Sequence, residues 1–183
     1  ADDSARPQWV AIDLLSQAEH GPDSQVVLVT DSPTLAERVE GEIRALLEQL
    51  DRADVTAKAL EHAVIVRVSD MNEAISVSER YAPEHLIIQT SDAEAVAERI
   101  TTAGSVFVGH HTPESLGDYI SGTNHTLPTG GWARTTSGLA VVDFMRRMTV
   151  QNATPAGLAE LGPAAARLAA HETLDAHRLA IEL

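Results

Sequence analysis

The apolar residues of this chain fall into short continuous runs, and longer amphipathic stretches separate these runs. Four runs occur before residue 110, at 25–30, 63–68, 86–89 and 105–108. Short runs that do not alternate with polar residues are typical of strands buried on both faces of a sheet. Because amphipathic stretches lie between the runs, the pattern predicts an α/β fold with a mostly parallel sheet flanked by helices.

The stretches between the runs carry apolar residues at the three- and four-residue spacing of helices. The expected helices cover residues 7–20, 33–50, 55–61, 70–81 and 91–102. Two of them have ordinary start signals, because Ser32 precedes Pro33 and Asp70 stands at the start of another helix. The alternation of strands and helices therefore continues up to residue 108.

The character of the sequence changes after Gly109. Residues 110–138 are rich in Gly, Thr, Ser, His and Pro, and they predict a long loop with one helical turn at 114–120. Loops of this length inside compact proteins are usually functional or disordered, and the aromatic residues here favour an ordered loop.

A mainly helical tail is expected at the end of the chain. Residues 148–151 predict a strand, and an alanine-rich helical pattern begins near Pro155. We therefore expect an α/β sheet domain at 1–137, which carries most of the candidate site residues, and a C-terminal tail at 138–183.

Composition and charge narrow the possible functions. With 183 residues, 44% of them hydrophobic and 22% charged, the chain can bury a core like an ordinary globular protein. A formal net charge of −14 argues against nucleic-acid partners and against anionic membranes, because both favour basic surfaces. The chain has no cysteine, no signal-peptide pattern and no apolar run near the ~20 residues that span a membrane, which is compatible with the cytoplasm.

The clearest candidate for chemistry is a Glu-His pair that occurs in Ala82-Pro83-Glu84-His85-Leu86. Proline cannot extend a preceding helix and restricts the residue before it, so the pair should lie at a junction between a loop and a strand. Side chains at such a junction can point into a cleft, where a carboxylate and an imidazole can act as acid and base. The same dipeptide occurs at 19–20 and 61–62, so the pair alone is weak support.

Other polar residues are candidates only in combination. Gln17 and His20 stand three residues apart on a predicted helix, so they could share a metal ion or simply lie at the helix end. Asp118 and His125 lie in the loop-rich region, where turn chemistry is the ordinary explanation. The tail offers Glu172 and His177, which could equally belong to a solvated helix face. No glycine-rich phosphate loop of the dinucleotide or Walker type is present.

The order of these motifs resembles histidinol dehydrogenase along essentially the whole chain. The series is Gln17-Ala18-Glu19-His20, Ala82-Pro83-Glu84-His85-Leu86, Thr112-Pro113-Glu114-Ser115-Leu116-Gly117-Asp118-Tyr119, Gly122-Thr123-Asn124-His125 and Ala170-His171-Glu172 to His177-Arg178. The chain looks like the C-terminal portion of that enzyme without its N-terminal half. The missing initiator methionine and an end inside a helical pattern agree with a piece of a longer protein.

The resemblance implies an activity. Members of this family oxidise L-histidinol to L-histidine in two steps through an aldehyde, with two molecules of NAD, as the last step of histidine biosynthesis. By this similarity His85 would remove the alcohol proton, and Glu84 would activate the water that adds to the aldehyde.

The resemblance also implies a zinc site and a substrate site. The zinc ligands would be Gln17, His20, Asp118 and His177, and together with His85 they would surround the substrate. His125 and Glu172 match residues that contact substrate.

Two further expectations come from the resemblance. The family is a homodimer in which the tail reaches the active site of the partner, so Glu172 and His177 would complete a shared site. The NAD-contacting positions would lie in the missing half, which leaves an incomplete Rossmann-like sheet here. We therefore expect the isolated chain to be inactive, and it need not retain zinc.

Two other function classes remain open from the residues themselves. A zinc-dependent hydrolase could use Glu84 as the base on metal-bound water without any redox cofactor. Alternatively, the chain could be a non-catalytic α/β interaction module whose ligand-type residues are only turn and surface residues.

Overall fold

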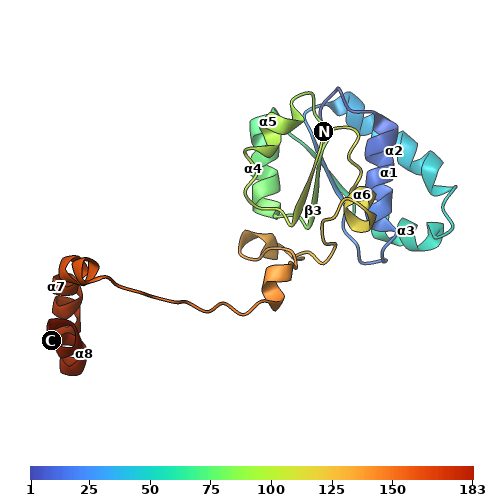
Figure 1. The fold of residues 1–183 in the computed structure, drawn as a ribbon. Coiled ribbons are helices and arrows are strands. Elements are labelled where there is room, and N and C mark those ends of the chain that lie inside the picture. Colours follow the sequence, from blue (N-terminus) through green and yellow to red (C-terminus); the bar gives the residue numbers. More distant parts are fainter. The chain divides into compact units, whose positions relative to one another are not determined.

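The computed structural model describes all residues from Ala1 to Leu183, and the chain divides into two compact units. The first, Ala1–Asp143, is called the sheet unit here, and the second, Phe144–Leu183, the tail unit. Figure 1 shows the elements of each unit in chain order. Neither unit contains a helix that is long and apolar enough to cross a membrane.

The sheet unit alternates strands with helices, as the hydrophobic pattern predicts. Its strands are β1 (Val27–Thr30), β2 (Val64–Arg67), β3 (His85–Ile88) and β4 (Ser105–Val108). Its α-helices are α1 (Pro7–Ala18), α2 (Pro33–Leu47), α3 (Ala53–Leu60), α4 (Met71–Tyr81), α5 (Ala93–Ala97) and α6 (Glu114–Tyr119). Two short 3-10 turns follow, η1 (Trp132–Arg134) and η2 (Val141–Phe144), the second ending one residue into the tail unit.

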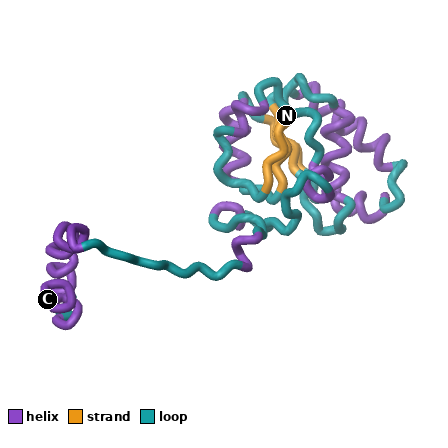
Figure 2. Tube along the Cα trace, viewed as in Figure 1, coloured by secondary structure: helices purple, strands orange, loops and turns teal.

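The strands are parallel but form two separate pairs. β1 pairs with β2, with Val27 opposite Val64, and β3 pairs with β4, with His85 opposite Ser105. The pairing is parallel, as the sequence pattern predicts, but β1 and β3 do not pair with each other, so the four strands do not form one continuous sheet. In Figure 2 all four strands nevertheless lie together in the middle of the unit, with helices around them.

Local sequence signals set the helix ends. Ser32 caps α2, because its Oγ accepts a hydrogen bond from the backbone N–H of Leu35 at 3.1 Å. Asp70 caps α4 in the same way, accepting from the N–H of Glu73 at 2.9 Å. The Glu73 carboxylate in turn accepts from the N–H of Ser69, the residue before the cap, so the two side chains hold the start of the helix reciprocally.

Three apolar clusters lie in the sheet unit, and two of them cover different strand pairs. One lies between α1, α2 and β1 and includes Val10, Ala11, Leu28, Leu35 and Val39. The other lies between α4, α5 and β3 and includes Ile75, Ile88, Ala93 and Val96. Figure 1 shows α1, α2 and α3 on one side of the strands, and α4 and α5 on the other. The unit therefore has helices on both faces of its strands.

The tail unit contains the two helices α7 (Pro155–His171) and α8 (Asp175–Glu182), which pack against each other. Gly162 of α7 permits this approach, because a Cβ atom there would lie 3.0 Å from Cγ2 of Ile181. The predicted helical tail is thus confirmed.

Two predicted elements are wrong. Residues 148–151 are irregular and exposed instead of forming a strand, since no neighbouring strand pairs with their backbone groups. Helix α5 is also much shorter than the predicted 91–102, because the chain turns after Ala97 to reach β4.

Replacing Ser32 by alanine should destabilise the sheet unit. The change removes the cap of α2 and a side-chain hydrogen bond to Asp3, so we expect the free energy of unfolding to fall by about 1 kcal/mol. Chemical denaturation followed by circular dichroism measures this change. Ser32→Thr retains the acceptor and should stay close to the parent protein. Thr34→Ala, at an exposed position of the first turn, is the matched control, and an equal loss in that variant would contradict the capping role.

Candidate active site

The backbone around Glu84 and His85 places both residues at the start of a strand. Ala82 ends α4 in the left-handed region, with φ of 54°, and Pro83 follows it. β3 then begins at His85, so the predicted junction between a loop and a strand is confirmed. The neighbouring strand comes close at this point: the N–H of Gly104 donates to the carbonyl of Pro83, and the N–H of Ser105 donates to that of Glu84.

Two carboxylates from α6 approach the ring of His85. Nε2 of His85 lies 3.7 Å from Oε1 of Glu114 and 3.8 Å from Oδ1 of Asp118. Glu114 and Asp118 are four residues apart, so they project from the same side of their helix. The ligand atoms of these three residues, which we call the His85 cluster, lie within 4.8 Å of one another. Such a group of one imidazole and two carboxylates can hold a metal ion.

Aromatic packing supports the ring of His85. The ring of Phe107 on β4 stacks against it with a centroid distance of 6.0 Å and an interplanar angle of 29°. Gly117 of α6 makes room for Phe107, because a Cβ atom there would lie 2.5 Å from the phenyl ring. The imidazole is therefore held between an aromatic ring and the carboxylates of α6.

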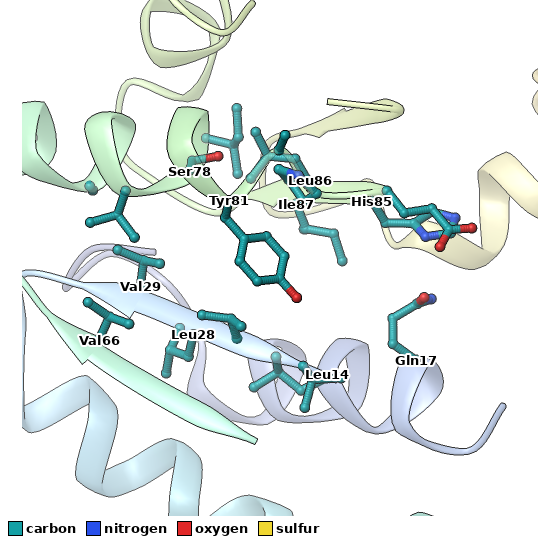
Figure 3. Close-up of a pocket in the computed structure, with 18 of the residues that line it drawn as sticks. Leu14, Gln17, Leu28, Val29, Val66, Ser78, Tyr81, His85, Leu86 and Ile87 are labelled. Carbon is teal, nitrogen blue, oxygen red and sulfur yellow. The ribbon is translucent and has the colours of Figure 1, made fainter. Parts of the chain in front are cut away.

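Several buried polar atoms of this region have no hydrogen-bond partner. They are Nε2 of Gln17, Nε2 of His85 and Oε1 of Glu114. Buried polar groups in proteins are almost always paired, so unpaired groups call for an explanation such as a bound ion or ligand. Figure 3 shows Gln17 on α1 and His85 on β3 facing the same end of a cavity. A metal ion could satisfy Nε2 of His85 and Oε1 of Glu114, whereas the amide N–H of Gln17 calls for a hydrogen-bond acceptor, such as an oxygen of a polar ligand.

Burial changes the acid–base properties of the cluster. Burial, together with the hydrogen bond and charge of the nearby Asp118 carboxylate, raises the pKa of Glu114 to about 7. Burial lowers the pKa of His85, although the charges of Glu84 and Asp118 act in the opposite direction. A neutral imidazole at physiological pH can accept a proton, and a carboxyl group that titrates near neutrality can hold one. The site is therefore suited to proton transfer.

Comparison with known proteins identifies the family. The sequence model of histidinol dehydrogenase matches residues 1–183, which is the whole chain. The chain belongs to the histidinol dehydrogenase family. The histidinol dehydrogenase of Idiomarina loihiensis is 58% identical over 183 residues, which cover 100% of this chain and 41% of the relative. That of Bacteroides thetaiotaomicron is 51% identical over 181 residues, which cover 99% of this chain and 42% of the relative.

A solved structure of the family has the same backbone. The crystal structure of histidinol dehydrogenase from Elizabethkingia anophelis matches with a TM-score of 0.96 and 42% sequence identity, over 100% of this chain and 42% of that one. The α/β fold predicted from the sequence is confirmed by this match. The chain thus spans about two fifths of the length of these relatives.

The structure brings together some of the residues that the family resemblance singles out. Gln17 is half-buried at the end of α1, and Asp118 lies in the His85 cluster. His20 is exposed just beyond α1, yet it is near enough to contribute to the lowered pKa of His85, after the larger effect of burial. Glu84 is half-buried and precedes His85 directly.

The other predicted residues are not part of this cluster. His125 lies on an exposed turn after α6, and it has no hydrogen bond in the structure to any residue named above. Glu172 and His177 belong to the tail unit, where both are exposed. Their roles in zinc and substrate binding remain predictions.

Sequence reasoning did not single out Glu114 as a site residue. Its side chain is only 3% exposed, and it is the nearest carboxylate to Nε2 of His85. A signal existed, since Glu114 and Asp118 are four residues apart directly after Pro113, which begins a helix that presents both on one side. Only the fold shows that this side faces His85.

Replacing Gly104 by alanine should disturb the backbone of the Glu-His pair. A Cβ atom at Gly104 would lie 2.5 Å from the carbonyl oxygen of Glu84, which the backbone cannot avoid without moving. We expect a loss of roughly 1–3 kcal/mol in the free energy of unfolding. Gly41 in α2 is the matched control, because a Cβ atom added there would have no neighbouring atom within 4 Å. Gly41→Ala should raise stability by roughly 0.5–1 kcal/mol, and a similar effect of both changes would rule out the close contact.

The buried Asp13 predicts a pH-dependent stability. Burial raises its pKa from 3.8 to about 6, and a hydrogen bond from Gln89 only partly offsets this. The folded protein therefore binds the proton of Asp13 more tightly than the unfolded chain does. The contribution of Asp13 to the free energy of unfolding is greatest below pH 4, and it is lost as the pH rises through 6.

Asp13→Asn should remove this part of the pH dependence. We expect the variant to be more stable than the parent at pH 7, by on the order of 1 kcal/mol after allowance for solvent screening. Between pH 4 and 6.5 its stability curve should be flatter, as measured by urea unfolding at several pH values. Asp51→Asn on an exposed turn is the control and should leave the curve unchanged. Parallel curves for parent and Asp13→Asn would show that Asp13 is not the group responsible.

Proposed function

We propose that the sheet unit contributes the acid–base centre of a histidinol dehydrogenase active site, which oxidises L-histidinol to L-histidine through an aldehyde with two NAD molecules. The observation that carries this proposal is the buried His85 cluster, in which a partly desolvated imidazole meets two carboxylates next to Glu84. Membership of the histidinol dehydrogenase family along residues 1–183 supports the choice of reaction. We propose that this reaction belongs to histidine biosynthesis in the cytoplasm.

His85 is proposed as the base of the first oxidation. Its ring is half-buried and its pKa is lowered by burial, so it is neutral at physiological pH and can take the alcohol proton as hydride leaves. The stacked Phe107 fixes the plane of the ring, which keeps the accepting nitrogen directed at the carboxylates of α6. Glu114 can then hold or release a proton at the same nitrogen, since its own pKa is near neutrality.

Glu84 is proposed as the base of the second oxidation. It activates the water that adds to the aldehyde, and the hydrate formed is then oxidised to the acid. The charge of Glu84 acts on the His85 ring, raising its pKa against the larger effect of burial, and this nearness supports both proton transfers at one substrate position. The carbonyl of Glu84 is held by the N–H of Ser105 at 2.9 Å, which restricts the residue's movement.

Zinc fits the residues around the cluster. We propose Gln17, His20, Asp118 and His177 as its ligands, because an amide oxygen, a carboxylate and two imidazoles are a donor set that zinc accepts. The unpaired buried Nε2 of His85 and Oε1 of Glu114 support an ion or a polar ligand in this region. When bound, zinc would supply Lewis-acid polarisation and orientation of the histidinol imidazole and amine. The protein groups then position the substrate and move its protons.

The remaining contributions are proposed to come from other parts of a dimeric enzyme. His125 and Glu172 contact substrate, and the tail unit provides Glu172 and His177 to the site of the partner subunit. NAD is proposed to bind through segments beyond the two fifths of the family length that this chain spans. Residues 1–183 alone are accordingly proposed to be inactive.

Glu84→Gln separates the two oxidation steps. In a full-length protein that contains these residues, we expect the rate from histidinal to histidine to fall by roughly 10²–10⁴-fold, while reduction of the first NAD is affected far less. NADH absorbance is followed with histidinol and, separately, with histidinal as substrate. The matched control is Glu61→Gln, which alters another Glu-His pair on an exposed helix end. Full aldehyde oxidation by Glu84→Gln would contradict the role of Glu84, and turnover without NAD would favour the hydrolase alternative.

A further inference from the structure

The His85 cluster is shielded from water although it carries two acidic side chains. The side chains of Glu114, His85 and Asp118 are only 3%, 11% and 17% exposed. Both carboxylates lie beside the imidazole, and neither is paired with a lysine or an arginine. Buried charges in proteins are normally paired or bound to a metal ion. The two carboxylates therefore lack a cation that would balance them.

Two ligand atoms of the cluster face each other without a hydrogen bond. Nε2 of His85 and Oε1 of Glu114 are buried, and neither has a partner. They lie 3.7 Å apart, which is too long for a hydrogen bond between nitrogen and oxygen. Because buried polar atoms without partners are rare in proteins, this pair points to a ligand that lies between them.

The spacing of the ligand atoms fits a metal ion. Zinc holds nitrogen and oxygen ligands at about 2.0–2.2 Å, so two ligands in tetrahedral geometry are roughly 3.4 Å apart. Nε2 of His85 lies 3.7 Å from Oε1 of Glu114 and 3.8 Å from Oδ1 of Asp118. Both distances exceed the expected value by only a few tenths of an ångström, which small side-chain rotations remove. The stacked ring of Phe107 already holds the imidazole in this arrangement.

The cluster shares only Asp118 with the zinc ligands proposed above. Asp118 directs Oδ1 toward His85, which leaves its other oxygen, Oδ2, free to bind a different ion. In two-metal sites the ions lie about 3.5–4 Å apart, a separation that one carboxylate can bridge. An ion in the cluster is therefore compatible with zinc on the other side of Asp118.

We propose that the His85 cluster binds a second divalent transition-metal ion, such as Zn²⁺, in addition to the zinc proposed above. Its ligands are Nε2 of His85, Oε1 of Glu114 and Oδ1 of Asp118. One imidazole and two carboxylates are a donor set that suits zinc, whereas Mg²⁺ binds mainly carboxylates and water. Because only three protein ligands hold this ion, it exchanges with the medium more readily than the first ion does.

The second ion makes the cluster an inhibitory site. A metal ion on Nε2 occupies the lone pair with which His85 would accept the alcohol proton. Turnover is then blocked at high zinc concentration, and it recovers when a chelator removes the ion. This consequence rests on the proposed function, because it requires His85 to act as the base, whereas the metal site itself does not.

Equilibrium dialysis against zinc chloride tests the site in a full-length protein that contains these residues. Each subunit of the parent should retain one zinc ion in metal-free buffer and bind another, weaker one when zinc is added. Glu114→Gln keeps the size of the side chain and removes its charge. We expect it to weaken the second ion at least about 10-fold, since even the outer partners of metal ligands contribute that much. Magnesium chloride should not compete for the second site.

Variants at other positions separate the two ions. His85→Gln removes the nitrogen ligand and should also abolish binding of the second ion, so the test remains valid if Glu114→Gln does not fold. His20→Gln should release the first ion and leave the second. A first ion that survives this change would contradict the proposed zinc ligands without affecting the cluster. Glu94→Gln, at an exposed position of α5, is the matched control and should retain both ions.

Binding of a single ion by the parent would overturn the proposal and would mean that a proton, not a metal ion, neutralises the carboxylates. A second ion that is unaffected by both Glu114→Gln and His85→Gln would also overturn it, as would loss of the first ion in His85→Gln. The rate of NADH formation at rising zinc concentration tests the inhibition, and full turnover with the second ion bound would refute that part. Because binding is measured without turnover, failure of the proposed reaction remains distinguishable.

Discussion

The buried hydrogen bond between Asp13 and Gln89 is the contact on which the geometry of the candidate site depends. Nε2 of Gln89 donates to Oδ2 of Asp13 at 2.8 Å, and both residues are almost inaccessible to solvent. α1 packs in the core with α2 and β1, whereas Gln89 directly follows β3 in the other core. Because Gln17 lies one helical turn beyond Asp13, the bond that orients α1 also directs Gln17 toward His85.

The buried carboxylate in this hydrogen bond lowers the stability of the fold at neutral pH and also affects other groups of the site. A carboxylate removed from water binds its proton more tightly, so Asp13 opposes folding at neutral pH. Its charge also contributes to the raised pKa of Glu114, although burial of Glu114 is the larger cause. Perturbed carboxyl groups that destabilise a fold are found most often where a protein needs them for chemistry. The buried acids and the lowered pKa of His85 therefore belong to one electrostatic environment.

Environment, and not dipeptide identity, distinguishes the Glu-His pair at 84–85 from the exposed one at 61–62. Glu61 and His62 follow the end of α3 and remain in solvent. Glu84 and His85 follow a left-handed Ala82 and a proline, which turn the chain into β3 beneath α6. The second strand pair thus fixes one side of the site, and α1 supplies the other.

The sequence by itself determined the elements and the family. Hydrophobic spacing is a local property, so it predicted the strands, most helices and the α/β class, and the order of the motifs pointed to histidinol dehydrogenase. It failed for residues 148–151, because a short apolar run becomes a strand only beside a partner. Only the tertiary structure decided that the strands form two pairs and that Glu114 faces His85. Such contacts join residues far apart in the chain, and they depend on how α1, β3 and α6 pack together, which spacing along the sequence does not record.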